Sequence, residues 1–214
     1  GNLTLRANSI VKEVIYDANL KEAIGVVVID AISKKELTFY SKIIFLNAST
    51  IATAAILLNS ISPTFPFGLG NSSGQVGHNL MDHVVNEGTY ASHPGLKEFY
   101  YEGRSPGAIY IPRFQNLNNK TKSKKFIRGY GIQGKGEREN WQSKNIEGFG
   151  ASLKAELAKP GVWKINLGGR GETLPNYENK ITLDTENVDK WGIPLVNVHF
   201  KYRDNELAML DDMT

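Results

Sequence analysis

The chain has four histidines, the residues that most often act as acids, bases or metal ligands near neutral pH: His78, His83, His93 and His199. No two are spaced as His-x-x-x-His, and none follows a glutamate three residues earlier, so no helix would present two ligands to one metal. Asp82 and His83 are adjacent, and adjacent side chains of an extended segment point to opposite faces. The histidine pattern therefore predicts neither a metal site nor a catalytic dyad.

Other reactive patterns are missing or have the wrong context. The absence of cysteine excludes disulfides, zinc–thiolate sites, iron–sulfur clusters and thiol nucleophiles. There is no Gly-x-Ser-x-Gly elbow and no P-loop. The glycines of Gly68-Leu-Gly70-Asn-Ser-Ser-Gly74 follow a predicted helix and prolines instead of a strand, so we expect a loop and not a dinucleotide-binding turn. The carboxylate pairs Glu137/Glu139 and Asp211/Asp212 lie among charged residues, which favours a solvated surface.

One segment has the pattern of an anion site. The apolar run Ile43–Leu46 predicts a strand, and Thr50 can cap a helix over residues 51–59. Ala48 and Ser49 form the turn between them, where the backbone N–H groups of a helix N-terminus favour an anion. Two interpretations stay open: a phosphate-bearing cofactor against Ala48 and Ser49, or an ordinary strand–helix turn.

A basic cluster lies further along the chain and consists of Lys120, Lys122, Lys124, Lys125 and Arg128. It stands among Asn and Ser residues, with no aromatic residue before Phe126. A solvated loop is expected, and contact with a phosphate or polyanion is the alternative. The net charge of the whole chain, +3, is too small to imply a nucleic-acid partner, and none is predicted.

The elements that carry these residues predict a mixed fold. Strands are expected at 3–5, 10–11, 14–16, 24–29 and 37–40, and the continuous apolar run 24–29 predicts a strand buried on both faces. Later strands with glycine-rich turns predict an antiparallel sheet: Val84–Tyr90, Ala108–Phe114, Phe126–Gln133, Gly161–Leu167, Lys180–Leu183 and Val196–Phe200. Short helices are expected over Ser152–Ala158, ended by Pro160, and from Asp204 as cap.

Composition places the chain among soluble globular proteins. Of its 214 residues, 41% are hydrophobic and 22% are charged. No apolar run approaches the ~20 residues of a membrane span, and the N-terminus has no signal-peptide pattern. We expect a soluble protein of the cytoplasm or periplasm.

The segment Val76-Gly77-His78-Asn79-Leu80-Met81-Asp82-His83 resembles the Val-Gly-x-Asn-Leu-x-Asp-His signature of the glucose–methanol–choline family of FAD-dependent oxidoreductases. Residues 43–60 are similar to that family's apolar strand, Ala-Gly turn and leucine-rich helix, with Ser49 in place of the usual glycine. Residues 3–14 and 171–194 are similar to further strands of the family, in the same order. The resemblance covers nearly the whole chain.

The resemblance implies an α+β fold derived from an α/β architecture. A partial FAD-binding domain is expected over residues 1–83, a substrate-binding domain with an antiparallel sheet over 84–203, and the start of a truncated helix over 204–214. The resemblance further implies four cofactor-binding residues: Val11, Ala48, Ser49 and Asn79. His83 matches the histidine of the motif and is expected to order its loop through hydrogen bonds.

Members of the family begin with a Gly-x-Gly-x-x-Gly unit for FAD and end with a segment that bears the catalytic histidine; neither is in this sequence. We therefore expect an internal fragment that has no catalytic residue, is inactive by itself and holds no FAD. The parent protein is expected to transfer a hydride from an alcohol or sugar CH–OH group to flavin, as a choline-dehydrogenase-like enzyme. The alternative is a non-enzymatic ligand-binding module that reuses the substrate-domain fold.

In the family, the antiparallel sheet forms one wall of the substrate pocket. The aromatic residues that are candidates for this wall are Tyr110, Trp141, Phe149 and Trp163. Each is also explained by core packing, so none is assigned as a substrate contact. The identity of the alcohol or sugar and the oligomeric state are not predicted.

Overall fold

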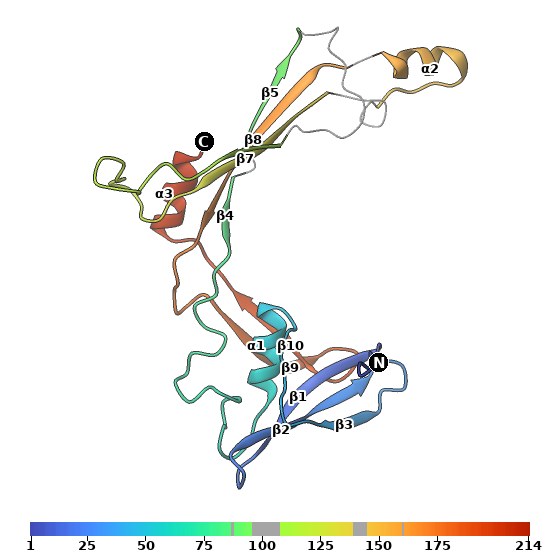
Figure 1. Ribbon diagram of the computed structural model, residues 1–214, viewed down its shortest axis with the longest axis vertical. Coiled ribbons are helices and arrows are strands. Elements are labelled where there is room, and N and C mark those ends of the chain that lie inside the picture. Colours follow the sequence, from blue (N-terminus) through green and yellow to red (C-terminus); the bar gives the residue numbers. More distant parts are fainter. Residues whose placement is uncertain (87, 96–107, 139–144, 160) are drawn as a thin grey trace. The chain divides into compact units, whose positions relative to one another are not determined.

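The computed structural model describes residues 1–86, 88–95, 108–138, 145–159 and 161–214. The chain divides into two units, each built from two stretches of sequence. Unit 1 comprises residues 1–81 and 175–201, and unit 2 comprises residues 82–174 and 202–214. Both units combine antiparallel strands with helices, so the chain has a mixed α+β fold, as expected (Figure 1).

The first sheet of unit 1 has three antiparallel strands in sequence order: β1 (Ser9–Asp17), β2 (Glu22–Asp30) and β3 (Glu36–Tyr40). The carboxylate of Asp17 closes the first turn by accepting hydrogen bonds from the N–H groups of Asn19 and Leu20. Neighbouring side chains of β2, Val28 and Ile29, are both buried, so this end of the strand is covered on both faces.

The rest of unit 1 consists of helix α1 (Thr50–Asn59) and a hairpin of β9 (Lys180–Val188) and β10 (Pro194–His199). Helix α1 packs against both β1 and β9, so it joins the N-terminal sheet to a hairpin far along the chain (Figure 1). The indole Nε1 of Trp191, in the hairpin turn, donates to the carbonyl of Ala31 at 3.2 Å and provides a second link.

Two strands that the sequence predicts in unit 1 are absent from the structure. Ile43–Leu46 and Leu3–Leu5 are irregular, and the side chains of Ile43 and Phe45 are 69% and 81% exposed. An apolar run becomes a strand only where a neighbouring strand takes its backbone hydrogen bonds. Neither segment has such a neighbour among the described residues, so both predictions were wrong.

The sheet of unit 2 has β4 (His83–Val85), β8 (Trp163–Glu172), β7 (Gly131–Arg138) and β6 (Ala108–Ile111) in that order, and β5 (Thr89–His93) also pairs with β8. The single strand predicted over Val84–Tyr90 is therefore two strands, β4 and β5, on the same partner. The break contains Gly88, whose φ of 92° only glycine adopts easily, and its N–H is held by Asn86 Oδ1 at 2.6 Å.

Two helices complete unit 2: α2 (Gly150–Ala158), close to its expected range, and α3 (Asp204–Asp212). The ending that the sequence predicts for α2 at Pro160 lies outside the described residues. Helix α3 packs on β4 and β8, where a buried cluster joins Met209 to Val84, Phe126 and Tyr130. A Cβ on Gly171 would lie 2.5 Å from Met209 Sδ, so this glycine allows the helix to approach the sheet closely.

One strand of unit 2 begins later than the sequence predicts. The strand predicted from Phe126 begins only at Gly131, because Phe126 itself is 3% exposed and serves as an anchor in the core.

The units also divide the chain differently from the expected ranges 1–83, 84–203 and 204–214. The chain leaves unit 1 after residue 81, but residues 175–201 return to it and carry β9 and β10. No helix in the described parts of the chain combines the length and apolar character of a membrane span.

Glu206 holds the start of α3 in place. Its carboxylate accepts hydrogen bonds from the N–H groups of Arg203 and Leu174, at 2.9 and 3.0 Å, and its side chain is almost fully buried. Burial alone would raise the pKa of Glu206, but these hydrogen bonds outweigh it and hold the pKa below its usual value. The expected cap Asp204 is instead the first residue of the helix, because the Glu206 carboxylate satisfies the backbone there.

We predict that Glu206→Gln lowers the stability of the chain at pH 7 by about 1–3 kcal/mol, because a neutral amide binds the two N–H groups more weakly. The native pKa is depressed, so the stabilisation is complete above the ordinary glutamate pKa of about 4.3 and is lost as the pH falls through the lowered value. Urea unfolding between pH 3 and pH 7 measures both effects. Glu147→Gln, at an exposed position, is the control, and equal pH profiles for the two variants would contradict the prediction.

Candidate functional site

A cavity of about 460 Å³ opens in unit 1 between β1, α1 and the β9–β10 hairpin, and we call it the slot. Strand β1 lines it with residues 9–12, and the turn and helix line it with Ala48, Ile51, Ala52 and Ala55. The hairpin closes it with Leu183, Asp189 and residues 193–196. The lining is mainly apolar, with small alanines on the helix side, which favours a flat apolar or heteroaromatic group.

Two side chains at the end of α1 set the distance between the helix and β1. The buried hydroxyl of Ser60 accepts the N–H of Val14 at 2.8 Å and donates to the carbonyl of Ile56 at 2.7 Å. The amide of Asn59 donates to the carbonyl of Lys12 at 3.0 Å. The outer edge of β1 is thus bound to the end of α1 by the side chains of Ser60 and Asn59. The slot lies beside these two contacts.

A cation lies at the edge of the slot. The register of β1 and β2 shifts between Val11 and Glu13, so Lys12 sits at a bulge. Its Nζ lies 2.7 Å from the Glu36 carboxylate, and this hydrogen bond raises the pKa of Lys12 above its usual value in spite of partial burial. Lys12 is therefore charged at neutral pH and paired with Glu36 on β3.

The structure brings together two of the four residues expected to bind a cofactor. Val11, from β1, and Ala48, from the turn before α1, both line the slot although they lie far apart in sequence. Ser49 lines a separate hollow of about 510 Å³ on unit 1 with Thr53, Leu57 and others. Asn79 lines neither cavity. The cofactor contacts of all four residues stay predictions.

Ser49 has a backbone conformation that favours glycine, the residue that the resembled family usually has at this position. Its φ of 75° and ψ of 168° belong to a region that side chains with a Cβ rarely adopt. Ser49 occupies the N-cap position, and its side chain makes no capping hydrogen bond. Thr50, the cap predicted from sequence, is the first residue of the helix. The N–H groups of the first turn are therefore not blocked by a cap side chain.

The motif around Asn79 is a loop docked on the start of β9. The carbonyl of Gly77 accepts the N–H of Ile181, and the N–H of Leu80 donates to Asn179, both at 2.8 Å. A Cβ on Gly77 would lie 2.7 Å from the Ile181 carbonyl oxygen, so the contact requires glycine. The side chain of Asn79 donates to Gln75 Oε1 within the same loop. The motif is thus explained by backbone pairing in unit 1.

The histidines of the motif have packing partners. His78 stacks on Tyr177 with ring centroids 3.7 Å apart, and its Nδ1 lies 2.7 Å from the Tyr177 carbonyl oxygen. The carbonyl of His83 accepts the Tyr202 hydroxyl, and its ring Nδ1 lies 3.4 Å from the Gly171 carbonyl oxygen. The ordering role expected of the His83 side chain stays a prediction, since the contact with Tyr202 uses its backbone carbonyl. In the described part of the chain, no cluster of three acidic or histidine residues could hold a metal ion.

The aromatic candidates for a substrate wall belong to unit 2. Tyr110 is 66% exposed on β6, and Trp163 on β8 lies under the Arg138 guanidinium, 5.8 Å from its ring. Phe149 precedes α2 and is 90% exposed, and Trp141 lies outside the described residues. Tyr110 is the only one of the described three whose exposed ring projects from a strand of the sheet.

Sequence reasoning missed most of the slot. Ala48, Ala52, Ala55 and Asn59 follow the spacing of one helix face, a signal that the sequence contains. The hairpin residues 193–196 carry no such signal, because only the packing of α1 on the distant hairpin brings them to the helix.

Two curated proteins are similar to this chain. A 2-methyl-1,2-propanediol dehydrogenase of Mycolicibacterium austroafricanum is 27% identical over an alignment of 214 positions, which covers 92% of this chain and 36% of that protein. A fructose dehydrogenase large subunit of Gluconobacter japonicus is 25% identical over 154 residues, 72% of this chain and 28% of that protein. No family model matches the chain. This chain spans about a third of the length of these relatives, and both are named as dehydrogenases, which supports an oxidoreductase.

We predict that Ser60→Ala lowers the free energy of unfolding by about 1–3 kcal/mol, because the N–H of the buried Val14 loses its acceptor. Urea unfolding of the 214-residue chain measures this loss. Ser73→Ala, in the exposed loop after α1, is the matched control and should change the stability by less than about 0.5 kcal/mol. Equal stabilities of the two variants would show that the hydroxyl bridge is not needed.

Proposed function

We propose that this chain is the central part of an FAD-dependent oxidoreductase of the glucose–methanol–choline type, which oxidises a CH–OH group of an alcohol or sugar. One observation carries the proposal: Val11 and Ala48, expected to bind FAD, line one apolar slot. The dehydrogenase names of both relatives support the reaction class, and the diol and the sugar in those names support a hydroxyl-bearing substrate.

The residues of the slot fit the adenine end of FAD. The alanines 48, 52 and 55 leave room for a flat ring, and the aliphatic residues of the hairpin provide the opposite wall. The uncapped first turn of α1 favours the negative charge of a bound dinucleotide. When bound, FAD supplies the hydride acceptor. The part of this chain in the reaction is then to bind and orient the adenosine half of the cofactor.

The 214 residues are expected to be inactive by themselves, since no catalytic residue is assigned to them. We predict that the purified chain contains no stoichiometric flavin and oxidises neither diols nor fructose. Absorbance near 450 nm and a dye-reduction assay measure these two properties. A flavin-loaded chain with turnover would contradict the assignment as an inactive part of a larger enzyme.

A bulky residue in the slot tests the site in the protein expressed from its full coding sequence. We predict that Ala52→Trp lowers the flavin retained after desalting by about tenfold or more, because the indole occupies the space of the adenine ring. Ala52 is exposed on α1, so the helix can accept the change. Ala155→Trp, an exposed alanine of α2 in unit 2, is the control.

Unchanged flavin content in the Ala52→Trp protein, with circular dichroism equal to that of the parent, would remove the slot as the adenine site. If the parent protein itself binds no flavin but does bind an alcohol or sugar, the alternative of a non-enzymatic binding module replaces the enzyme.

A further inference from the structure

The basic cluster of unit 2 forms a built surface and not a loose loop. It lies in the connection 112–130 between β6 and β7, which we call the basic loop. Asn116 ties the two sides of this loop together: its Oδ1 accepts the N–H of Ser123 at 2.7 Å, and its Nδ2 donates to the carbonyl of Phe126 at 3.1 Å. A turn closed by Asn118 and Thr121 supports its tip.

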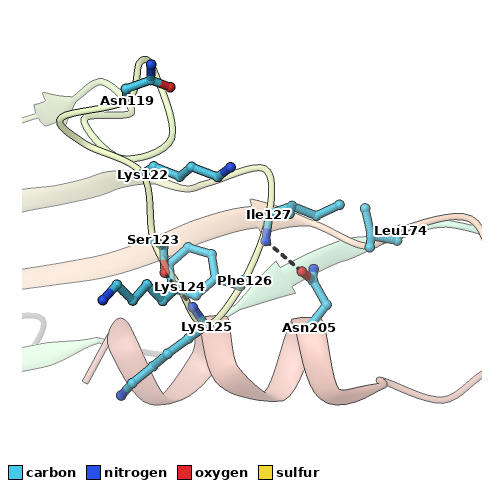
Figure 2. A pocket seen from close by; sticks show the side chains of 9 residues that line it. All are labelled: Asn119, Lys122, Ser123, Lys124, Lys125, Phe126, Ile127, Leu174 and Asn205. Carbon is cyan, nitrogen blue, oxygen red and sulfur yellow. Dashed lines mark hydrogen bonds between the residues drawn. The ribbon is translucent and has the colours of Figure 1, made fainter.

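The end of the basic loop is anchored on the core of unit 2. Phe126 is buried beside Tyr130 and Met209, and the N–H of Ile127 donates to Asn205 Oδ1 at 2.8 Å (Figure 2). The loop therefore presents its lysines from a backbone that is already ordered. Because the loop is already ordered, binding a partner costs less conformational entropy than binding to a flexible segment would.

The positive charge of the loop is only weakly compensated. Lys125 Nζ lies 3.9 Å from the Asp211 carboxylate, and both side chains are more than half exposed, so this pair contributes little. Within the described residues, no ion pair joins Lys120, Lys122, Lys124 or Arg128 to a carboxylate. Figure 2 shows the three lysines 122, 124 and 125 pointing in different directions, which suits an extended acidic surface better than one small anion.

Apolar and amide groups lie among these cations. An open hollow of about 720 Å³ is lined by Lys122 to Ile127 together with Asn119, Leu174 and Asn205. Ile127 is 59% exposed, and Leu117 on the same loop is 54% exposed. Such apolar contacts do not match a phosphate polymer, and Phe126, the aromatic residue that lines the hollow, is buried and cannot stack on bases. A protein surface with carboxylates around an apolar side chain matches both properties.

We propose that the basic loop is a docking surface for an acidic protein segment, with carboxylates on Lys122 and Lys124 and an apolar side chain in the hollow beside Ile127. This surface belongs to unit 2 and does not depend on the cofactor proposed for unit 1. The lysines would attract acidic segments, and the apolar hollow would select those that also carry an apolar side chain.

Two labelled peptides of equal net charge test the proposal by fluorescence anisotropy: one of glutamates with interspersed leucines, and one of glutamates alone. The leucine-containing peptide is expected to bind at least about threefold more tightly, since it alone fills the hollow. Lys122→Glu combined with Lys124→Glu should weaken its binding about tenfold or more at low salt. Ile127→Ser should remove the difference between the two peptides.

Lys34→Glu combined with Lys35→Glu is the matched control, because these exposed lysines of the β2–β3 turn give the same change in net charge on unit 1. Equal loss in both double variants, or equal affinity for the two peptides, overturns the proposal. Duplex DNA or vesicles of phosphatidylglycerol that bind as tightly as the leucine-containing peptide, through the same lysines, also overturn it in favour of a nucleic acid or a membrane surface.

Discussion

The hydroxyl of Ser60 is the contact on which the geometry of unit 1 depends. It is almost fully buried, accepts the N–H of Val14 and donates to the helix carbonyl of Ile56. A strand edge without a strand neighbour has N–H groups that must find another acceptor. Because this acceptor comes from the end of α1, the helix is held against β1 at one end, and the slot lies along the rest of that boundary.

In unit 2, the acceptor for such unpaired backbone N–H groups is a charged side chain. Glu206 accepts two backbone N–H groups at the start of α3, one of them from Leu174 on a distant segment. The carboxylate is buried but remains ionised, because its hydrogen bonds stabilise the charge more than burial opposes it. In both units, polar side chains near a helix end hold the helix on its sheet.

These two constraints place the two candidate surfaces on different parts of the fold. The slot of unit 1 is mainly apolar and lies beside an uncapped helix start, which suits the nucleotide cofactor that we propose. The basic loop of unit 2 depends on α3, since Asn205 accepts the N–H of Ile127 and Met209 packs in one cluster with Phe126. The two proposed sites, one for a cofactor and one for a protein partner, thus belong to different units.

Local sequence patterns were sufficient for elements whose partners are close in the chain. The strands β1, β2, β3, β9 and β10 and the helices α1 and α2 were predicted near their observed positions, because alternation, apolar runs and turn residues act over a few neighbouring residues. The same reasoning failed for Ile43–Leu46, whose side chains are those of a buried strand but which has no strand beside it among the described residues. It also joined β4 and β5, which Gly88 separates.

For the candidate site, the sequence by itself determined the residue types: Val11 on a strand, Ala48 and Ser49 at a helix start, and five basic residues in one polar loop. The tertiary structure alone decided which of them meet. It placed Val11 and Ala48 in one slot, turned Ser49 to another hollow, and ordered the basic loop through Asn116 and Phe126. The physical reason is that hydrogen bonds such as Ser60 to Val14 join segments far apart in sequence, and no local pattern specifies such a pair.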